Sequence, residues 1–231
     1  IVLHEAQYAE GLRTFNVDFV TWKSIRHNTM VVNCRQVQRS HHTNKFRICL
    51  LVESSPITSV NRQTVRFRRL LDFLVDQTDD DVQLVTSEVV MRIPPTMWRG
   101  RVPIHYTQGF MVPYFSDVSV SFDWTATALA VISEQRPQVI HVSSPSLLMP
   151  LACLASRIFQ IPLVASYHAH LPVYARTKLP PIINFIVECL VWAILFMFHS
   201  CADLTVVMSP QRRRDLEEHS IPRCVVWPKG V

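Results

Sequence analysis

Residues 139–170 read VIHVSSPSLLMPLACLASRIFQIPLVASYHAH, and this stretch decides the fold. Its first segment, 139–142, is a short apolar run that predicts a buried strand, and the turn-prone 143–145 follows it. Residues 146–159 are almost wholly apolar and predict a helix, and 162–166 predict a second strand. A strand, a helix and a strand in this order indicate a βαβ unit, whose two strands lie parallel in one sheet.

The same alternation extends toward the N-terminus. Residues 46–53 (FRICLLVE) predict a strand that is apolar on both faces and therefore central in the sheet. Apolar residues at helical spacing predict a helix over 61–76, and another strand follows at 82–86. Residues 1–45 show no sustained period and are interpreted as transit peptide, linker or mistranslated sequence, so we assign them no fold.

Between the two regions lies a proline-rich stretch, 87–118, which predicts an irregular excursion with short strands. Phe122, Thr125 and Ile132 are spaced for a helix, which ends before Pro137. Together these elements predict that residues 46–231 form one α/β domain with a doubly wound parallel sheet of the Rossmann-like kind.

The most hydrophobic stretch is 182–198, interrupted only by Asn184 and Glu188. A stretch of this length with a central acid is marginal for crossing a bilayer. A membrane span and a buried or interfacial helix are both open, and we expect the second. Further elements are predicted downstream: a strand at 204–208, a helix that begins at Ser209 and Pro210, and a strand at 224–227.

Composition excludes several classes of protein. The net charge of +5 over 231 residues is mild, and no basic stretch is interleaved with aromatic residues, so no nucleic-acid partner is expected. A mild positive charge does suit contact with anionic lipid. The chain has 4 glycines, and none follows the first predicted strand. A dinucleotide-dependent oxidoreductase is therefore excluded, because its phosphate-binding turn requires glycines there.

The 6 cysteines are widely spaced and form no Cys-x-x-Cys pair. They predict small buried core residues in a reducing compartment rather than a disulfide framework. No paired histidines stand at ligand spacing on a predicted helix, so no metal site is expected.

The candidate chemistry lies in 166–174 (SYHAHLPVY), where two histidines and two tyrosines follow a predicted strand. In open parallel sheets, ligands bind at the carboxyl ends of the strands. A histidine there can bond a sugar hydroxyl or move a proton. The same residues can equally be ordinary loop histidines with tyrosines that pack, and spacing alone does not decide between the two.

Several motifs resemble those of the plant and cyanobacterial sulfoquinovosyltransferases. Residues 139–174 are similar to a family stretch that runs IIHxSSPG, then an apolar helix, then a strand into SYHTHxPxY. Residues 52–56 (VESSP) with Arg66 and Phe67 resemble the family's VEPSP and RF, and matches at 202–209 and 227–231 follow in order. That family belongs to glycosyltransferase family 4, whose members are retaining, metal-independent enzymes of the two-domain GT-B type.

The resemblance implies roles for individual residues. His168 aligns with the histidine that contacts the donor sugar near the reacting carbon, and His170 would be its neighbour or an acceptor contact. The loop 53–58 would face the donor phosphates. The other residues that are expected to bind substrate are Ser55, Asn61, Arg66, Ser143, Ser144, Tyr167 and Tyr174.

The chain departs from the family pattern at Asn61 and Arg62, where Ser-Gly is expected and where glycine would let backbone approach a phosphate. The resemblance covers 46–231, so we expect this sequence to be the N-terminal, acceptor-side domain. The C-terminal donor domain would supply the groups that neutralise the diphosphate. Since that electrostatic term is normally the largest in catalysis, the sequence by itself is expected to be inactive.

The sequence thus predicts part of a retaining hexosyltransferase that moves sulfoquinovose from UDP-sulfoquinovose to diacylglycerol, with no metal or other cofactor. Alternatives are a family 4 transferase that moves a neutral hexose to a lipid, and a non-catalytic fragment that binds a membrane or a partner. The expected place is a membrane surface, with Arg176 and Lys178 near lipid headgroups. It would be the plastid envelope if the sulfolipid interpretation holds, and otherwise the cytoplasmic face of a membrane.

Overall fold

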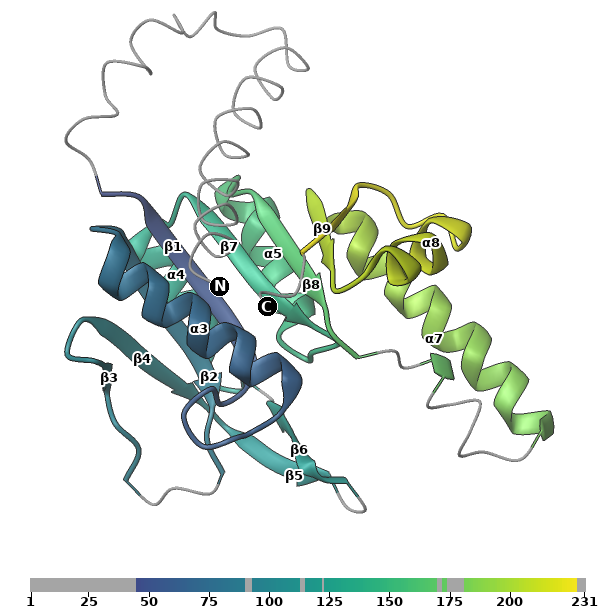
Figure 1. Cartoon of the computed structure of the whole chain (residues 1–231), viewed down its shortest axis with the longest axis horizontal. Helices are drawn as coiled ribbons and strands as arrows, with labels where there is room; N and C mark the ends of the chain where they lie inside the picture. The colour runs from purple at the N-terminus through teal and green to yellow at the C-terminus, as the bar shows by residue number, and fades with distance from the viewer. Residues whose placement is uncertain are drawn as a thin grey trace, which may run out of the picture.

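The computed structural model describes residues 45–89, 93–112, 115–121, 123–169, 172–173 and 181–227. Its centre is an 8-stranded sheet in the order β10-β9-β8-β7-β1-β2-β4-β3 (Figure 1). All neighbouring strands in it are parallel except β3 and β4. The strands are β1 (Arg47–Ser54), β2 (Asp81–Ser87), β3 (Met97–Trp98), β4 (Val102–Thr107), β7 (Val139–Ser144), β8 (Leu163–Tyr167), β9 (Leu204–Val207) and β10 (Cys224–Val226).

The direction of winding reverses beside β1. From β1 the chain adds β2 and β4 on one side, and it then returns to place β7, β8, β9 and β10 on the other. Ile48 of β1 accordingly pairs with Val82 of β2 and with Val139 of β7. The topological switch point therefore lies between β1 and β7, and ligands of open α/β sheets bind outside the carboxyl ends of the strands at such a point.

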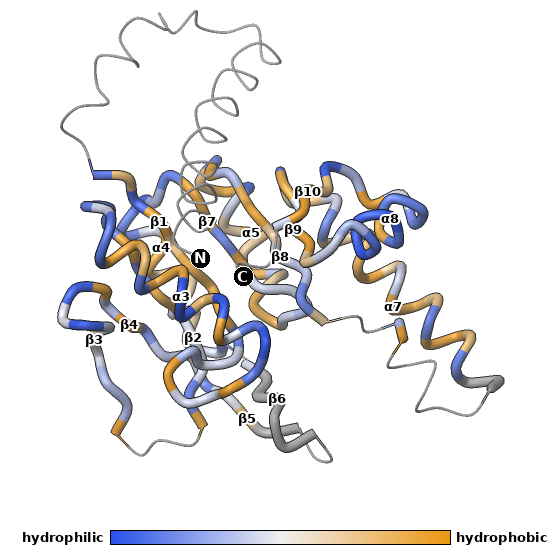
Figure 2. Tube along the Cα trace, viewed as in Figure 1, coloured by the Kyte–Doolittle hydropathy of each residue, from blue (hydrophilic) through white to orange (hydrophobic). Residues whose placement is uncertain are grey.

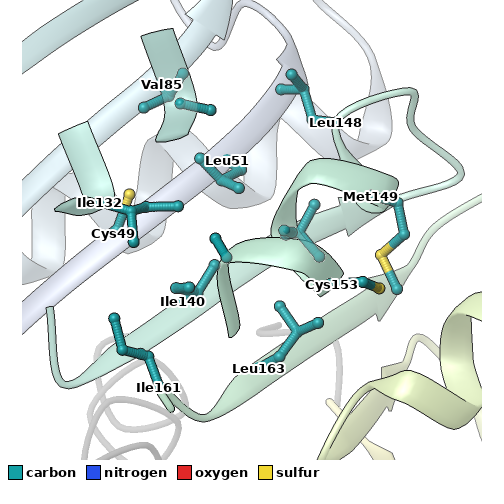
Figure 3. Close-up of a cluster of buried hydrophobic side chains, with 14 of the residues drawn as sticks. Cys49, Leu51, Val85, Ile132, Ile140, Leu148, Met149, Cys153, Ile161 and Leu163 are labelled. Carbon is teal, nitrogen blue, oxygen red and sulfur yellow. The ribbon is translucent and has the colours of Figure 1, made fainter. Parts of the chain in front are cut away.

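Helices cover both faces of the sheet, which confirms the predicted doubly wound α/β fold. Leu50 and Val52 of β1 pack in one core cluster with Phe67 and Leu70 of α3 (Arg62–Gln77). The alternate residue Leu51 points to the opposite face, where α4 (Thr127–Gln135) and α5 (Met149–Phe159) pack (Figure 3). Both faces of β1 are buried, so its continuous apolar run follows from its central place.

Two predicted helices begin later than their patterns indicate. The helix expected from Phe122 begins at Thr127, because the carboxylate of Asp123 accepts hydrogen bonds from the N–H groups of Thr127 and Ala128 (2.8 and 2.7 Å). The helix expected from 146 begins at Met149. In front of it, Ser143 and Ser144, predicted as loop, are the last two residues of β7.

A separate hairpin of β5 (Gly109–Val112) and β6 (Phe115–Ser121) lies near the ends of β1 and β2. Gly109 is required at its start, because a Cβ there would lie 2.8 Å from Cγ2 of Val89 and 2.9 Å from Cβ of Ser87. The chain can therefore pass the end of β2 at this distance only without a side chain.

Helix α7 (Pro181–Cys201) is longer than the predicted 182–198 and projects beyond the sheet (Figure 1). Within Asn184–Cys201 only 11% of the window is buried, so of the expected buried or interfacial helix the buried alternative is wrong, while the interfacial one stays a prediction. By length and composition alone this helix could cross a membrane, so its length is no longer marginal for a span. Most of its trace is hydrophobic (Figure 2), and its exposed large side chains include Phe185, Ile186 and Leu190.

The last turns of α7 are nonetheless part of the domain's core. Leu195, 3% exposed, packs in a cluster with Tyr167 of β8, Val207 of β9 and Leu216 of α8 (Pro210–Glu218). Helix α8 begins as predicted, with the Ser209 side chain accepting a hydrogen bond from the N–H of Arg212. Of residues 1–45, to which no fold was assigned, all but Lys45 lie outside the described residues.

Candidate active site at the switch point

Three neighbouring strands end together at the switch point. Glu53 is at the end of β1, and its N–H donates to Oγ of Ser143 at the end of β7 (3.3 Å). The carbonyl of Ser144 accepts the N–H of His168, the first residue after β8 (2.9 Å). The motifs VESSP and VIHVSSP and the described part of the third motif, SYHA (166–169), are thus brought to one edge of the sheet, as their strand-end positions predict.

The ring of His168 is held from two sides. Its Nε2 lies 2.9 Å from Oγ of Ser166, which itself donates to the carbonyl of Val142 (3.4 Å). With the Ser166 proton donated to Val142, Nε2 would carry the imidazole proton and Nδ1 would be the acceptor. The ring also packs on Phe67 (5.4 Å between centroids) and Trp227 (6.5 Å).

His168 is neutral at physiological pH. Burial is the main cause that lowers its pKa to about 3, and the neighbouring His141 and Arg66 contribute to the same decrease. The side chain is nonetheless partly exposed at the surface of the domain. Because the imidazole is neutral and Nδ1 carries a lone pair, His168 can accept a hydrogen bond from a sugar hydroxyl. It does not act as an acid near neutral pH.

Arg66 contacts Trp227, one of the two rings that pack against His168. Its guanidinium stands 5.3 Å from the centre of the Trp227 ring, and Nη1 donates to the Trp227 carbonyl (3.3 Å). Arg66 therefore contacts the support of His168, and its expected contact with the donor stays a prediction.

The loop after β1 is ordered by its own hydrogen bonds. Asn61 caps α3, because its Oδ1 accepts the N–H of Thr64 (2.8 Å) while Oγ1 of Thr64 accepts the N–H of Asn61 (2.9 Å). Oγ of Ser55 accepts the N–H of Ile57 (3.2 Å). The departure from Ser-Gly thus has a structural role, since an asparagine is a preferred N-cap. That Ser55 and Asn61 contact the donor sugar nucleotide remains a prediction.

Three expected substrate contacts lie beneath the surface. Ser143 is 0% exposed, Ser144 is 3% exposed and Tyr167 is 1% exposed, with the Tyr167 ring in the core cluster beside Leu195. These side chains shape the edge from below. His170 and Tyr174 fall outside the described residues, as do Arg176 and Lys178.

The environment of the Glu53 carboxyl group could not be foreseen from the sequence, which predicted only a loop facing phosphates. Oε1 of Glu53 accepts hydrogen bonds from the N–H groups of Ser121 (2.8 Å) and Leu147 (3.1 Å). Glu53 is 7% exposed, and burial raises its pKa to about 7. The group therefore joins β1 to β6 and to the loop before α5. An acid in an otherwise apolar strand was the available signal.

His199, in the last turn of α7, was missed altogether. Its Nε2 lies 2.8 Å from Oγ of Ser144, and its Nδ1 lies 3.1 Å from Oγ1 of Thr205. It is 0% exposed, and burial lowers its pKa to about 4. In the sequence, His199 is only a histidine at the end of an apolar helix, and nothing in its neighbouring residues indicates these hydrogen bonds.

Within the described residues, no group of three or more His, Cys, Asp and Glu side chains could hold a metal ion. Independence from metal ions remains a prediction.

The sequence model of Glycosyltransferase Family 4 matches residues 63–231, which include Ser143, Ser144 and His168. The chain belongs to glycosyltransferase family 4. It is 30% identical over 188 residues to sulfoquinovosyl transferase SQD2 of Arabidopsis thaliana, covering 80% of this chain and 35% of that protein. It is 25% identical over 187 residues to a GDP-mannose-dependent alpha-mannosyltransferase of Mycolicibacterium smegmatis, covering 80% and 48%.

This family 4 chain therefore spans about a third and about half the length of these two relatives. Among solved structures, UDP-GlcNAc 2-epimerase from Methanocaldococcus jannaschii is 12% identical with a TM-score of 0.46, over 78% of this chain and 45% of that one. The fold of the family 4 chain is assigned from its own strand order.

Proposed function

We propose that this family 4 chain is the acceptor-side domain of a retaining GT-B sulfoquinovosyltransferase that transfers sulfoquinovose from UDP-sulfoquinovose to diacylglycerol. The observation that carries the proposal is the meeting of VESSP, VIHVSSP and SYHA at the ends of β1, β7 and β8. The similarity to a sulfoquinovosyl transferase supports this donor.

In this proposal His168 contacts the donor sugar. Its neutral ring offers Nδ1 to a sugar hydroxyl, and the bonds to Ser166 and Ser144 hold the ring and backbone in one orientation. A fixed partner of this kind favours catalysis because it needs no reorganisation when the glycosidic bond breaks. The charge on the diphosphate leaving group would be neutralised by residues of the second domain, and no metal is invoked.

The anionic sulfonate would need cationic or N–H partners, because burying it unpaired would cost several kcal/mol. Arg66 is already bonded to Trp227. Arg62, exposed at the start of α3, is the other candidate on this side. Because exposed arginines are by default solvated, we expect the second domain to supply most of the sulfonate recognition.

We further propose that α7 attaches the protein to the surface of a membrane, in the plastid envelope for the sulfolipid function. Its exposed apolar residues include Phe185 (71%), Ile186 (64%) and Leu190 (57%). The adjoining α5 exposes Leu154 (49%) and Ile158 (57%). Such a surface binds lipid through buried apolar area.

Peripheral attachment fits α7 better than a span does. In its last turns Leu195 is packed in the core and His199 is hydrogen-bonded to Ser144. Crossing a bilayer would require these contacts to break. We expect high salt or carbonate to release the protein from membranes. Retention until detergent is added would instead indicate a span.

Matched variants test the lipid-facing surface. Replacing Phe185 and Ile186 together by serine is expected to reduce sedimentation with anionic vesicles. The control is Val60→Ser, which removes an apolar side chain that is even more exposed (82%) from the loop before α3. Equal loss of vesicle binding in both would contradict the role of α7.

Transfer of a neutral hexose to a lipid is the second candidate, and the similarity to an alpha-mannosyltransferase favours it. The deciding assay gives the full-length protein UDP-sulfoquinovose and UDP-glucose at equal concentration with diacylglycerol, and separates the lipid products. We expect the sulfolipid to dominate. A dominant glucolipid would exclude sulfoquinovose and leave the family 4 assignment, whereas no product from any UDP- or GDP-hexose would favour the non-catalytic alternative.

A further inference from the structure

His199 connects helix α7 to the backbone of the candidate catalytic residue. Its Nε2 bonds Oγ of Ser144, and the carbonyl of Ser144 accepts the N–H of His168 (2.8 and 2.9 Å). The contact joins residues that are 55 positions apart in the sequence. His199 touches neither the His168 ring nor, at 0% exposure, the surface of the site.

Ser144 is a place where such support matters. It is the last residue of β7, and it pairs with Tyr167, the last residue of β8. Pro145 follows it and has no N–H, so the strand ladder receives no donor from the next residue. Strand ends open more readily than strand centres, and the side-chain bond to His199 restrains this one.

Burial makes the restraint insensitive to pH near neutrality. Because His199 stays neutral, one ring nitrogen donates and the other accepts, and Thr205 and Ser144 satisfy one nitrogen each. The edge of the Tyr167 ring meets the His199 ring at 5.8 Å and 89° and limits its rotation. Both nitrogens and the ring plane are thereby fixed.

We propose that His199 is a positioning residue of the transfer reaction, which acts through Ser144 to hold the backbone of His168 in its reactive place. The inference rests on the proposed function, in which His168 contacts the donor sugar. It also joins the lipid-facing helix α7 to the site, because the same helix carries the exposed Phe185 and the buried His199.

Two amide variants separate the two bonds of His199. Glutamine places its terminal amide near the position of Nε2 and can still reach Ser144, whereas asparagine reaches only the position of Nδ1, next to Thr205. In the full-length protein we expect His199→Asn to lower kcat by about tenfold to a hundredfold with little change in KM for the donor, as a small misplacement of a catalytic group does. His199→Gln should recover most of the loss.

Ser144→Ala removes only one hydroxyl group, so this variant can test the same hydrogen bond if His199→Asn fails to fold. If His199 acts through Ser144, the double variant Ser144→Ala with His199→Asn should lose no more kcat than the worse single variant. Thr205→Val is the matched control, since it removes the other bond of His199 with little change of shape. It is expected to lower stability without the fall in kcat.

Hydrogen exchange at the N–H of His168 tests the inference without any activity measurement. Exchange should become about tenfold faster or more in His199→Asn and in Ser144→Ala, and stay as in the wild type in Thr205→Val. Unchanged exchange in the first two variants, or additive losses of kcat, would overturn the positioning role. A wild-type protein without transferase activity would refute the proposed function and leave the exchange result to decide the role of His199.

Discussion

Replacing Glu53 by glutamine is expected to change how the stability of the domain depends on pH. The Glu53 carboxyl group is 7% exposed, and burial raises its pKa from 4.5 to about 7. Its Oε1 accepts two backbone N–H groups, from Ser121 and Leu147. A glutamine carbonyl oxygen can accept the same two hydrogen bonds, so the variant removes the ionisation and keeps the contacts.

The sign and size follow from the two pKa values. Because the folded state holds this proton more tightly than the unfolded state, the stabilisation is fully present below pH 4.5 and is lost as the pH rises through about 7. Between pH 5 and pH 8 the free energy of unfolding should fall by about 2.5 kcal/mol from Glu53 alone. Glu53→Gln should lack this fall.

The assay is urea unfolding of wild type and variant at pH 5 and pH 8, at one ionic strength. Other groups act in the opposite direction: burial lowers the pKa values of His141, His168 and His199, so their stabilisation is lost as the pH falls below about 6.5. These contributions cancel in the difference between the two proteins. We therefore expect the variant to gain about 2.5 kcal/mol relative to wild type on going from pH 5 to pH 8. An identical pH dependence in both proteins would refute the reasoning.

Three more outcomes are expected. His168→Ala should lower turnover by about a hundredfold or more with an unchanged circular dichroism spectrum, and near-wild-type turnover would remove His168 from catalysis. Gly109→Ala should lower the free energy of unfolding by about 1 to 3 kcal/mol, because its Cβ would meet the end of β2. The control is Gly100→Ala, whose Cβ would meet no atom within 4 Å. It should lower the free energy of unfolding by only about 1 kcal/mol, because the left-handed backbone at this position (φ +68°) is unfavourable for alanine. A loss at Gly100 that equals or exceeds the loss at Gly109 would contradict the crowding at Gly109. Arg66→Ala should raise the pKa of His168, measured by NMR titration, and should weaken the packing of Trp227. An unchanged pKa of His168 would show that the guanidinium charge does not affect the ring.

The order of strands and helices could be predicted because it is written in local patterns. Residues 48–52 are apolar at every position, and the structure buries both faces of β1 there. Helix α3 begins at Arg62, one residue after the predicted start at Asn61, since helical spacing is a property of neighbouring residues. Strand-end motifs then place Ser144 and His168 at one edge, because parallel strands share the direction of their carboxyl ends.

Other features depended on contacts between distant residues. The sequence of α7 is compatible with a span, a core helix or a surface helix, and packing of Leu195 against Tyr167 decides that its last turns belong to the domain. The boundary of α4 depended on a competing side chain, that of Asp123.

The sequence by itself determined the α/β class and the central place of β1, since periodicity is a sum of local preferences. The candidate role of His168 came from the family resemblance and stays a prediction. Only the tertiary structure decided the switch point beside β1, the raised pKa of Glu53 and the bond from His199 to Ser144. Each of these depends on which strands become neighbours and in what register. A buried polar group is satisfied by whichever partner the packed chain brings within about 3 Å, and no pattern of adjacent residues encodes that partner.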